Sequence, residues 1–259
     1  MLTVIYSAVI LVATTLGAFV GLGGGVIIKP ILDFIGAEPR MQVDFLSSMA
    51  VFTMSVVSTL RYIKNKVEFR KGIILFISFG SIAGGWLGSK SVDLLGTVAP
   101  QENIRCIQAF VLAVLLAAVC IYVSKERKSF QVKNNAAILL VGLMLGFFAS
   151  FLGIGGGPIN VAVLTLFFSM SVKESAVYSV AIIFFSQLSK LATLFVSTGF
   201  EPYAHQWKTL IFILPAAILG GIIGSKFNRR FDDKLIRKIF SAVMILLVAL
   251  NVYNGISYL

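Results

Sequence analysis

Long apolar segments separated by short polar connections cover almost the whole chain of 259 residues. A helix needs about 20 apolar residues to cross the hydrocarbon core of a bilayer. Eight segments come close to that length or reach it: 2–20, 43–60, 72–89, 104–123, 136–152, 175–196, 208–225 and 236–253. Shorter apolar tails follow runs of glycine, at 26–35 and 158–170. The pattern predicts an all-α polytopic membrane protein with about eight spanning segments.

Two glycine motifs occur twice along the chain. Gly21-Leu22-Gly23-Gly24-Gly25 returns as Gly153-Ile154-Gly155-Gly156-Gly157, and Gly84-Gly85-Trp86-Leu87-Gly88-Ser89-Lys90 returns as Gly220-Gly221-Ile222-Ile223-Gly224-Ser225-Lys226. Two similar halves, each with a glycine-broken apolar segment, are typical of transporters. We therefore expect a first transmembrane repeat at 1–124, a cytoplasmic basic linker at 125–133 and a second repeat at 134–259.

Composition agrees with a membrane protein and argues against a nucleic-acid partner. Hydrophobic residues make up 58% of the chain and charged residues 13%, whereas a soluble domain carries about 25% charged residues. The net charge is +11, but the basic residues gather in three short connections, at 61–71, 125–133 and 226–238. The expected partner is therefore the lipid bilayer, in the cell inner (plasma) membrane.

The placement of the basic residues predicts the topology. Short loops rich in Lys and Arg stay on the cytoplasmic side. The loop at 61–71 is basic while its counterpart at 197–208 is not, and the loops after the third span of each half show the reverse. Equivalent loops then lie on opposite sides of the membrane, which is an inverted repeat. This requires each glycine segment, 2–37 and 135–170, to form a hairpin that returns, and it places both termini outside the cytoplasm.

The triple glycines are the candidate site. Glycine is poor in a helix interior, costing about 1 kcal/mol relative to alanine, and broken helices within a membrane line a cavity or contact protein. The half-helix after each break presents unpaired N–H groups and a positive dipole end, which favour an anion. Close helix packing is the alternative. We prefer that alternative for the second motif, and the binding site for the triple glycines.

Polar residues near the breaks add further candidates. Aligning the spans that follow the hairpins pairs serines of the two halves, whose hydroxyls could contact an oxyanion or simply bond within the membrane. Lys29, Lys190 and Asn160 could bind an anionic substrate, although a lysine can also extend to the membrane surface, while Asp44 is expected at a span end. The candidate substrate-binding residues are Gly23, Gly24, Gly25, Lys29, Ser48, Ser55, Gly155, Gly156, Gly157, Asn160, Ser179, Ser186 and Lys190.

No pattern in the chain indicates catalysis. Cys106 and Cys120 lie fourteen residues apart in one apolar segment and are expected to be packing residues. The single His205 lies in a short connection, and the membrane segments hold neither a carboxylate pair nor a nucleophile with a base. We therefore expect neither an enzyme nor a metal or other cofactor.

The whole chain resembles the TauE/SafE family of sulfite exporters, also called toluene sulfonate uptake permeases. The resemblance rests on its two Gly-Leu/Ile-Gly-Gly-Gly segments and its two Gly-Gly-x-x-Gly-Ser-Lys stretches. The resemblance implies a permease for small sulfur-containing anions such as sulfite, thiosulfate, sulfoacetate or another sulfonate. Alternating access around the glycine breaks is the expected mechanism. A passive anion channel and a membrane scaffold are the alternatives. The substrate, the direction of transport, a coupling proton or ion, and the oligomeric state are left open.

Overall fold

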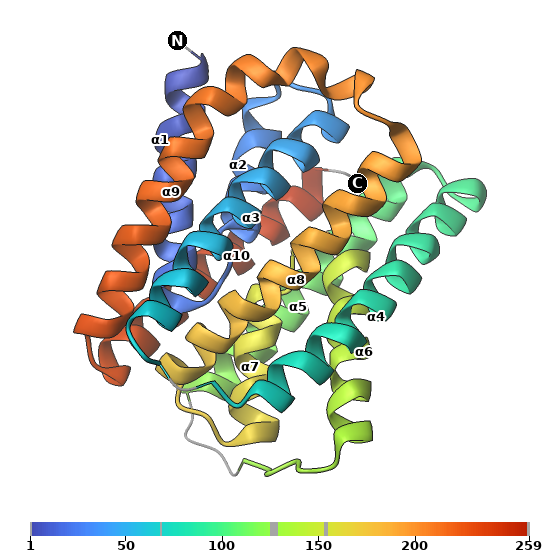
Figure 1. Ribbon diagram of the computed structural model, residues 1–259. Helices are drawn as coiled ribbons and strands as arrows, with labels where there is room; N and C mark the ends of the chain where they lie inside the picture. Colours follow the sequence, from blue (N-terminus) through green and yellow to red (C-terminus); the bar gives the residue numbers. More distant parts are fainter. Residues whose placement is uncertain (1, 68, 125–128, 153–154, 258–259) are drawn as a thin grey trace.

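The computed structural model describes residues 2–67, 69–124, 129–152 and 155–257. In these ranges the chain forms ten α-helices and one short 3-10 helix, and no strand (Figure 1). The first five helices are α1 (Leu2–Val20), α2 (Gly25–Ile35), α3 (Arg40–Lys64), α4 (Lys71–Val98) and α5 (Gln101–Ser124). The others are α6 (Asn135–Phe151), α7 (Gly157–Phe168), α8 (Val172–Thr198), η1 (Glu201–Gln206), α9 (Trp207–Arg230) and α10 (Asp233–Ser257).

Seven helical segments of the described chain are long and apolar enough to cross a membrane, which confirms the prediction of an all-α polytopic membrane protein. The eighth predicted span corresponds to α6, whose 17 residues are slightly fewer than the others have. The short tails after the glycine runs form α2, with 11 residues, and α7, with 12 residues. A helix rises 1.5 Å per residue, so neither can cross a core of about 30 Å.

Local sequence signals mark the starts of three helices, α6, α7 and α8. The Asn134 side chain accepts a hydrogen bond from the Ala136 amide at the start of α6, and the Ser171 hydroxyl accepts one from the Glu174 amide at the start of α8. Both are N-cap arrangements, which satisfy amide groups that lack a helical partner. Pro158 occupies the first turn of α7, where its missing N–H is not needed.

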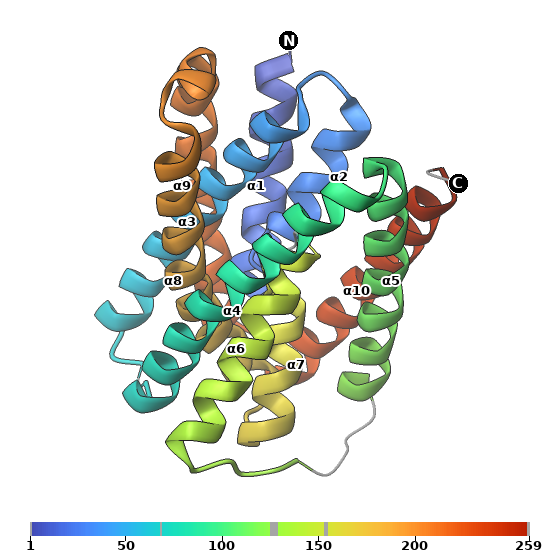
Figure 2. The same cartoon turned by 90° about the vertical axis from the view of Figure 1, so that its right-hand side faces the viewer.

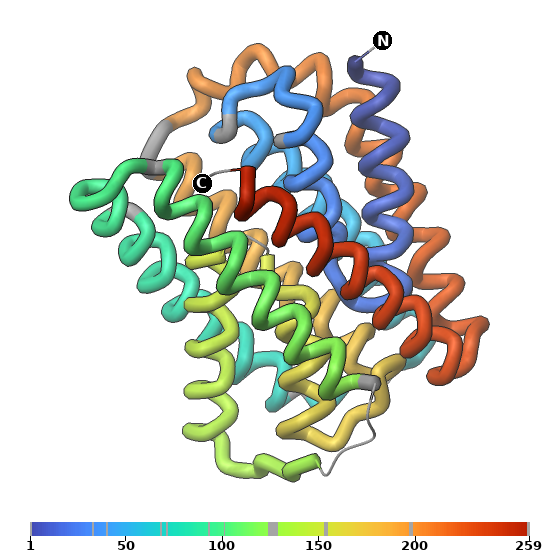
Figure 3. The backbone as a smooth tube through the Cα atoms, turned by 180° about the vertical axis from the view of Figure 1, so that it is seen from behind, coloured from blue at the N-terminus to red at the C-terminus, as the bar shows by residue number. Residues whose placement is uncertain are grey.

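The two sets of five helices are interlocked. Along their length, α4 packs on α6 and α1 packs on α9, while α10 lies beside α5, as seen from behind in Figure 3. Each of these pairs joins one helix from each set. The repeated Gly-Gly-x-x-Gly motif lies in two of the seams: a Cβ at Gly84 or Gly88 would overlap the backbone of α6, and one at Gly224 would overlap the backbone of α1. The packing interpretation of this motif is confirmed.

The two glycine-broken segments form hairpins that point in opposite directions. The hairpin of α1 and α2 starts and ends at the end of the molecule that holds the N-terminus, whereas that of α6 and α7 starts and ends at the other end (Figures 1 and 2). The connections α3–α4 and α9–α10, which carry basic residues, also lie toward this second end. An inverted repeat requires this arrangement, and the sidedness in a membrane stays a prediction.

Candidate functional site

The two glycine breaks meet in the middle of the molecule, backbone against backbone. Gly157, the first residue of α7, is so close to Leu22 that a Cβ there would overlap the Leu22 carbonyl group. The buried Ser179 hydroxyl of α8 donates a hydrogen bond to the Gly21 carbonyl at 2.7 Å and lies 3.4 Å from the Gly157 carbonyl oxygen. Ser179 therefore ties the first break to the second, and close approach explains why glycine occupies Gly157.

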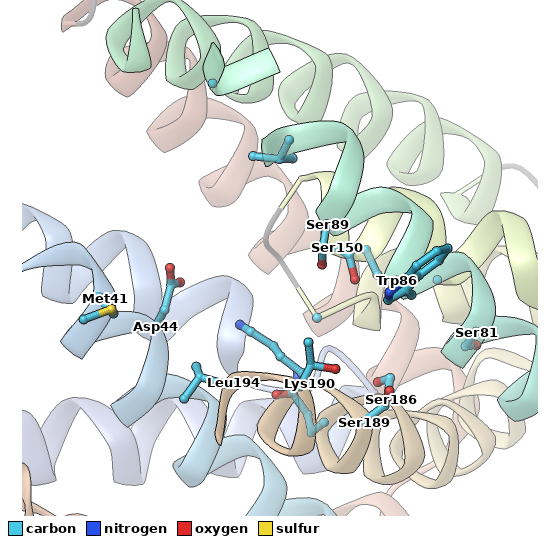
Figure 4. Close-up of a pocket in the computed structure, with 18 of the residues that line it drawn as sticks. Met41, Asp44, Ser81, Trp86, Ser89, Ser150, Ser186, Ser189, Lys190 and Leu194 are labelled. Carbon is cyan, nitrogen blue, oxygen red and sulfur yellow. The ribbon is translucent and has the colours of Figure 1, made fainter. Parts of the chain in front are cut away.

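A cavity of about 780 Å³ lies between α4 and α8 and extends to parts of α3, α5, α6 and η1 (Figure 4). Its polar lining residues are Asp44, Ser81, Ser89, Thr97, Ser150, Ser186, Gln187, Ser189, Lys190, Thr193 and Tyr203. Its main apolar lining residues are Met41, Trp86, Val92, Ile104 and Leu194. Mixed apolar walls with a few convergent polar groups are typical of sites for small molecules.

The cavity brings together only three of the thirteen predicted site residues, namely Gly155, Ser186 and Lys190. The remaining ten do not line it: Gly23, Gly24, Gly25, Lys29, Ser48, Ser55, Gly156, Gly157, Asn160 and Ser179. Most of these ten are buried in packing contacts between helices. The Ser55 hydroxyl donates to the Phe52 carbonyl of its own helix, at 2.7 Å.

The starts of the half-helices α2 and α7 do not line the cavity. Gly24 and Gly156, the residues before α2 and α7, both have positive φ angles and pack against the preceding helices α1 and α6. The cavity touches the second break at Gly155 and does not reach the described residues of the first. Gly153 and Ile154 lie outside the described residues. The expectation that both half-helix ends face one anion is thus not supported by the cavity wall.

The α8 wall of the cavity carries polar side chains from about one turn of that helix, among them Ser186, whose hydroxyl donates to the Ile183 carbonyl at 3.1 Å. Lys190 extends from α8 into the cavity, toward the side on which Asp44 lies (Figure 4). The Gln187 side chain is 4% exposed and its Oε1 atom is buried without a hydrogen-bond partner among the described residues. A buried amide oxygen without a partner costs free energy, and Gln187 was not predicted as a site residue although it stands between Ser186 and Lys190 in the sequence.

Lys29 and Asp44 form an ion pair, with 2.8 Å between Nζ and Oδ1. Lys29 lies on the half-helix α2 and Asp44 near the start of α3. Asp44 lines the cavity, whereas Lys29 does not. The charge of Lys29 is therefore compensated by a carboxylate of the protein, and Asp44, which was expected at a span end, lies in the wall of the candidate site.

Helix α3 packs directly on α9. By the repeat, this interface corresponds to the one between α8 and α4, which holds the cavity. Gly221 of α9 corresponds to Gly85 of α4 in the repeated motif, and a Cβ at Gly221 would lie 3.0 Å from the Met54 carbonyl oxygen. One hydrogen bond joins α3 to α9, from Ser58 Oγ to the Gly221 carbonyl (3.2 Å). Two more fix these helices to the end of α1: Tyr62 OH of α3 donates to the Ala18 carbonyl (3.2 Å), and Asn228 Nδ2 of α9 donates to the Phe19 carbonyl (2.8 Å). All three donors are buried.

The positions that correspond to Ser58, Tyr62, Gly221 and Asn228 in the other half line the cavity. Ser58 matches Ser189 and Tyr62 matches Thr193 in the alignment of the spans, while Gly221 matches Gly85 and Asn228 matches Val92 through the repeated motif. The closed interface lies beside the basic connections at 61–71 and 226–238, and the cavity lies in the opposite half of α4 and α8. The two interfaces that match in the repeated sequence therefore differ: one is packed, and the other holds the cavity.

Comparison with known proteins agrees with this architecture. The chain is 29% identical to the probable membrane transporter protein YunE of Bacillus subtilis (strain 168), over 95% of this chain and 96% of that protein. It is 25% identical to the probable membrane transporter protein MJ0441 of Methanocaldococcus jannaschii, over 88% and 87%. No solved structure matches it. Because the family model "Sulfite exporter TauE/SafE" matches residues 6–251, the chain belongs to the TauE/SafE family of multi-pass membrane transporters.

Proposed function

We propose that this protein is a carrier of the cell inner membrane that moves small sulfur-containing anions, such as sulfite, thiosulfate or a sulfonate, by alternating access. The halves at 1–124 and 134–259 would act as the two inverted repeats. The observation that carries this proposal is the difference between the two equivalent interfaces: α3 is packed on α9, whereas a cavity lies between α4 and the part of α8 at 186–194.

The cavity has the chemistry that an oxyanion needs. Lys190 supplies a positive charge, and Ser189 and Gln187 supply a hydroxyl and an amide group on the same face of α8. The Ser186 hydroxyl can donate to an anion when it leaves the Ile183 carbonyl, to which it donates in this structure. Hydrogen bonds between charged groups and oxyanions are about twice as strong as those between neutral groups. In a membrane, an ionisable residue inside the bundle marks a substrate path by default. We therefore place the anion between Lys190, Ser186 and Gln187, next to Gly155.

Exchange of the two interfaces would move the site from one side of the membrane to the other. In the alternate state, α8 would close on α4 with Ser189 donating to the Gly85 carbonyl, as Ser58 now donates to the Gly221 carbonyl. At the same time α3 would separate from α9. A passive channel needs a path that is open at both ends, and the buried contacts among α1, α3 and α9 favour a carrier over a channel.

Thiol labelling tests this exchange. In a background in which Cys106 and Cys120 are replaced by alanine, we expect Ser189→Cys to react with a membrane-impermeant maleimide added from the side opposite the basic loops. The matched variant Ser58→Cys should be protected, and it should become reactive from the basic-loop side when a transported anion is added. Equal reactivity of both cysteines without substrate would contradict a closed interface and favour a channel. Labelling from the wrong side would contradict the proposed topology.

A further inference from the structure

We infer that the cavity selects organic anions with a single negative charge, and that Asp44 sets this selectivity. The inference rests on the proposed function, since it specifies the substrate class of the same cavity. Asp44 carries a negative charge, as the substrate does, and a carboxylate in the wall weakens anion binding. Its presence therefore needs an explanation other than binding strength.

The charges at the cavity leave room for one negative charge. Among the described residues, Asp44 and Lys190 are the charged side chains that line the cavity, and Lys29 contacts Asp44 directly. Two ammonium groups and one carboxylate give a net charge of +1. A monovalent anion makes this cluster neutral, whereas a divalent anion leaves one negative charge without compensation. Uncompensated charge is costly wherever water is largely excluded.

The other charged groups in this region, including Arg105 beside the lining residue Ile104, do not line the cavity. Lys90 lies with its ammonium nitrogen 4.3 Å from the centre of the Trp86 ring, and it does not line the cavity. Among the other elements that contact α3, α1 carries no charged residue and α9 carries basic residues only near its two ends. Lys173 and Glu174 lie at the start of α8, at the other end of that helix from Lys190, and Glu201 begins η1; none of the three lines the cavity. Tyr203 of η1 also lines the cavity and is neutral below about pH 10.

The charged residues Asp44 and Lys190 of this cavity have no charged counterparts in the other half of the chain. The counterpart of Asp44 in the second half is Ser175, and the counterpart of Lys190 in the first half is Thr59. The Ser175 hydroxyl lies 3.0 Å from that of Thr165, so a neutral contact occurs on the equivalent face of α8. The contact between α7 and α8 in the second half thus joins neutral residues where the contact between α2 and α3 joins an ion pair. Packing alone therefore does not require Asp44 to be acidic.

The walls of the cavity suit an anion with an organic group. Its volume of about 780 Å³ falls in the range of about 300–1,000 Å³ that holds small organic ligands. Trp86, Ile104 and Leu194 offer apolar surface in the same cavity as Lys190. A sulfonate group could contact Lys190 and Gln187 while its carbon chain contacts this surface. We therefore place monovalent sulfonates ahead of divalent oxyanions such as sulfate.

Two probes of similar shape and different charge test the inference: isethionate, with one negative charge, and sulfoacetate, with two. Dissociation constants are measured by calorimetry on the purified full-length protein in neutral detergent. We expect the parental protein to bind isethionate at least about tenfold more tightly than sulfoacetate. Asp44→Asn should move the ratio toward sulfoacetate by about tenfold or more, because the cluster then carries a charge of +2. Asp44→Glu should keep the parental ratio.

The double variant Lys29→Met/Asp44→Asn separates charge from packing. It restores a net charge of +1 by removing a lysine that does not line the cavity, so we expect the parental preference for isethionate to return. It also keeps the test valid if Asp44→Asn alone destabilises the protein by leaving Lys29 without its partner. An unchanged ratio in the variants, with both anions bound, would overturn the role of Asp44 and leave the carrier proposal intact. Failure of the parental protein to bind either organic anion would overturn the inference, whereas the carrier proposal would be overturned only if sulfite and thiosulfate are not transported either.

Discussion

Replacing Gly157 by valine is expected to prevent the protein from reaching its folded state. A Cβ at this position would overlap the Leu22 carbonyl group, and that carbonyl belongs to the backbone of the other glycine break. Backbone cannot move aside as a flexible side chain can, and adding even well-tolerated methyl groups to a packed core costs about 1–3 kcal/mol. We expect a loss larger than this range. The measurement is the yield of monodisperse protein after detergent extraction, together with its thermal unfolding.

Gly72→Val is the matched control, since no atom lies within 4 Å of a Cβ at Gly72. This variant should give nearly the parental yield. Gly24→Val and Gly156→Val should also reduce stability, because both glycines adopt positive φ angles that valine rarely adopts. Neither glycine lines the cavity, so their effect on transport should follow the loss of folded protein. A Gly157→Val protein with parental yield and unfolding temperature would show that the two breaks are not in contact.

Lys190→Met is expected to weaken binding of the best transported anion by about ten- to a hundredfold, with a smaller effect on folding. A hydrogen bond to a charged group contributes about 1.5–3 kcal/mol, which corresponds to this range. Methionine keeps a similar length and apolar character without the charge. The measurement is the apparent affinity in uptake or calorimetry at equal protein level. Lys208→Met, at the exposed start of α9, is the control and should bind as the parental protein does. An unchanged affinity in Lys190→Met would move the anion away from α8.

Much of the fold could be predicted because it depends on patterns that are local in sequence. The apolar segments gave the membrane-spanning helices, and the runs of glycine gave the ends of α1 and α6 and the starts of α2 and α7. Pro158 in the first turn of α7 agreed as well. The packing role of the Gly-Gly-x-x-Gly motif could also be predicted, since small residues at this spacing allow close helix approach.

The cavity could be predicted only in part, because it depends on which of two equivalent interfaces is open. Duplication suggested that Ser55 and Ser186 would face the substrate together, but only Ser186 lines the cavity. The triple glycines had two physical explanations, an anion site and close approach, and the sequence contains nothing that distinguishes them. The contacts of Gly157 and Ser179 show close approach.

The charged and amide residues of the cavity gave weaker signals. Lys190 stood out as an ammonium group within an apolar segment, whereas the pairing of Lys29 with Asp44 joins two helices and has no local pattern. Asp44 and Gln187 are not repeated in the other half, so a search based on the duplication does not find them. They could have been found by asking which polar residues fall on the same face of α3 or α8 as a residue already suspected.

Exchange transport in proteoliposomes tests the central claim most directly. Vesicles with purified protein are loaded with one anion and placed in a trace of the same labelled anion, for a panel of isethionate, sulfite, thiosulfate, sulfoacetate, sulfate and chloride. The account predicts saturable uptake of at least one sulfur-containing anion, accelerated by the same anion inside the vesicle and strongly reduced in Lys190→Met. Uptake that rises linearly with concentration without acceleration by internal anion would contradict a carrier and indicate a channel. No uptake of any anion above protein-free vesicles would contradict transport of these substrates altogether.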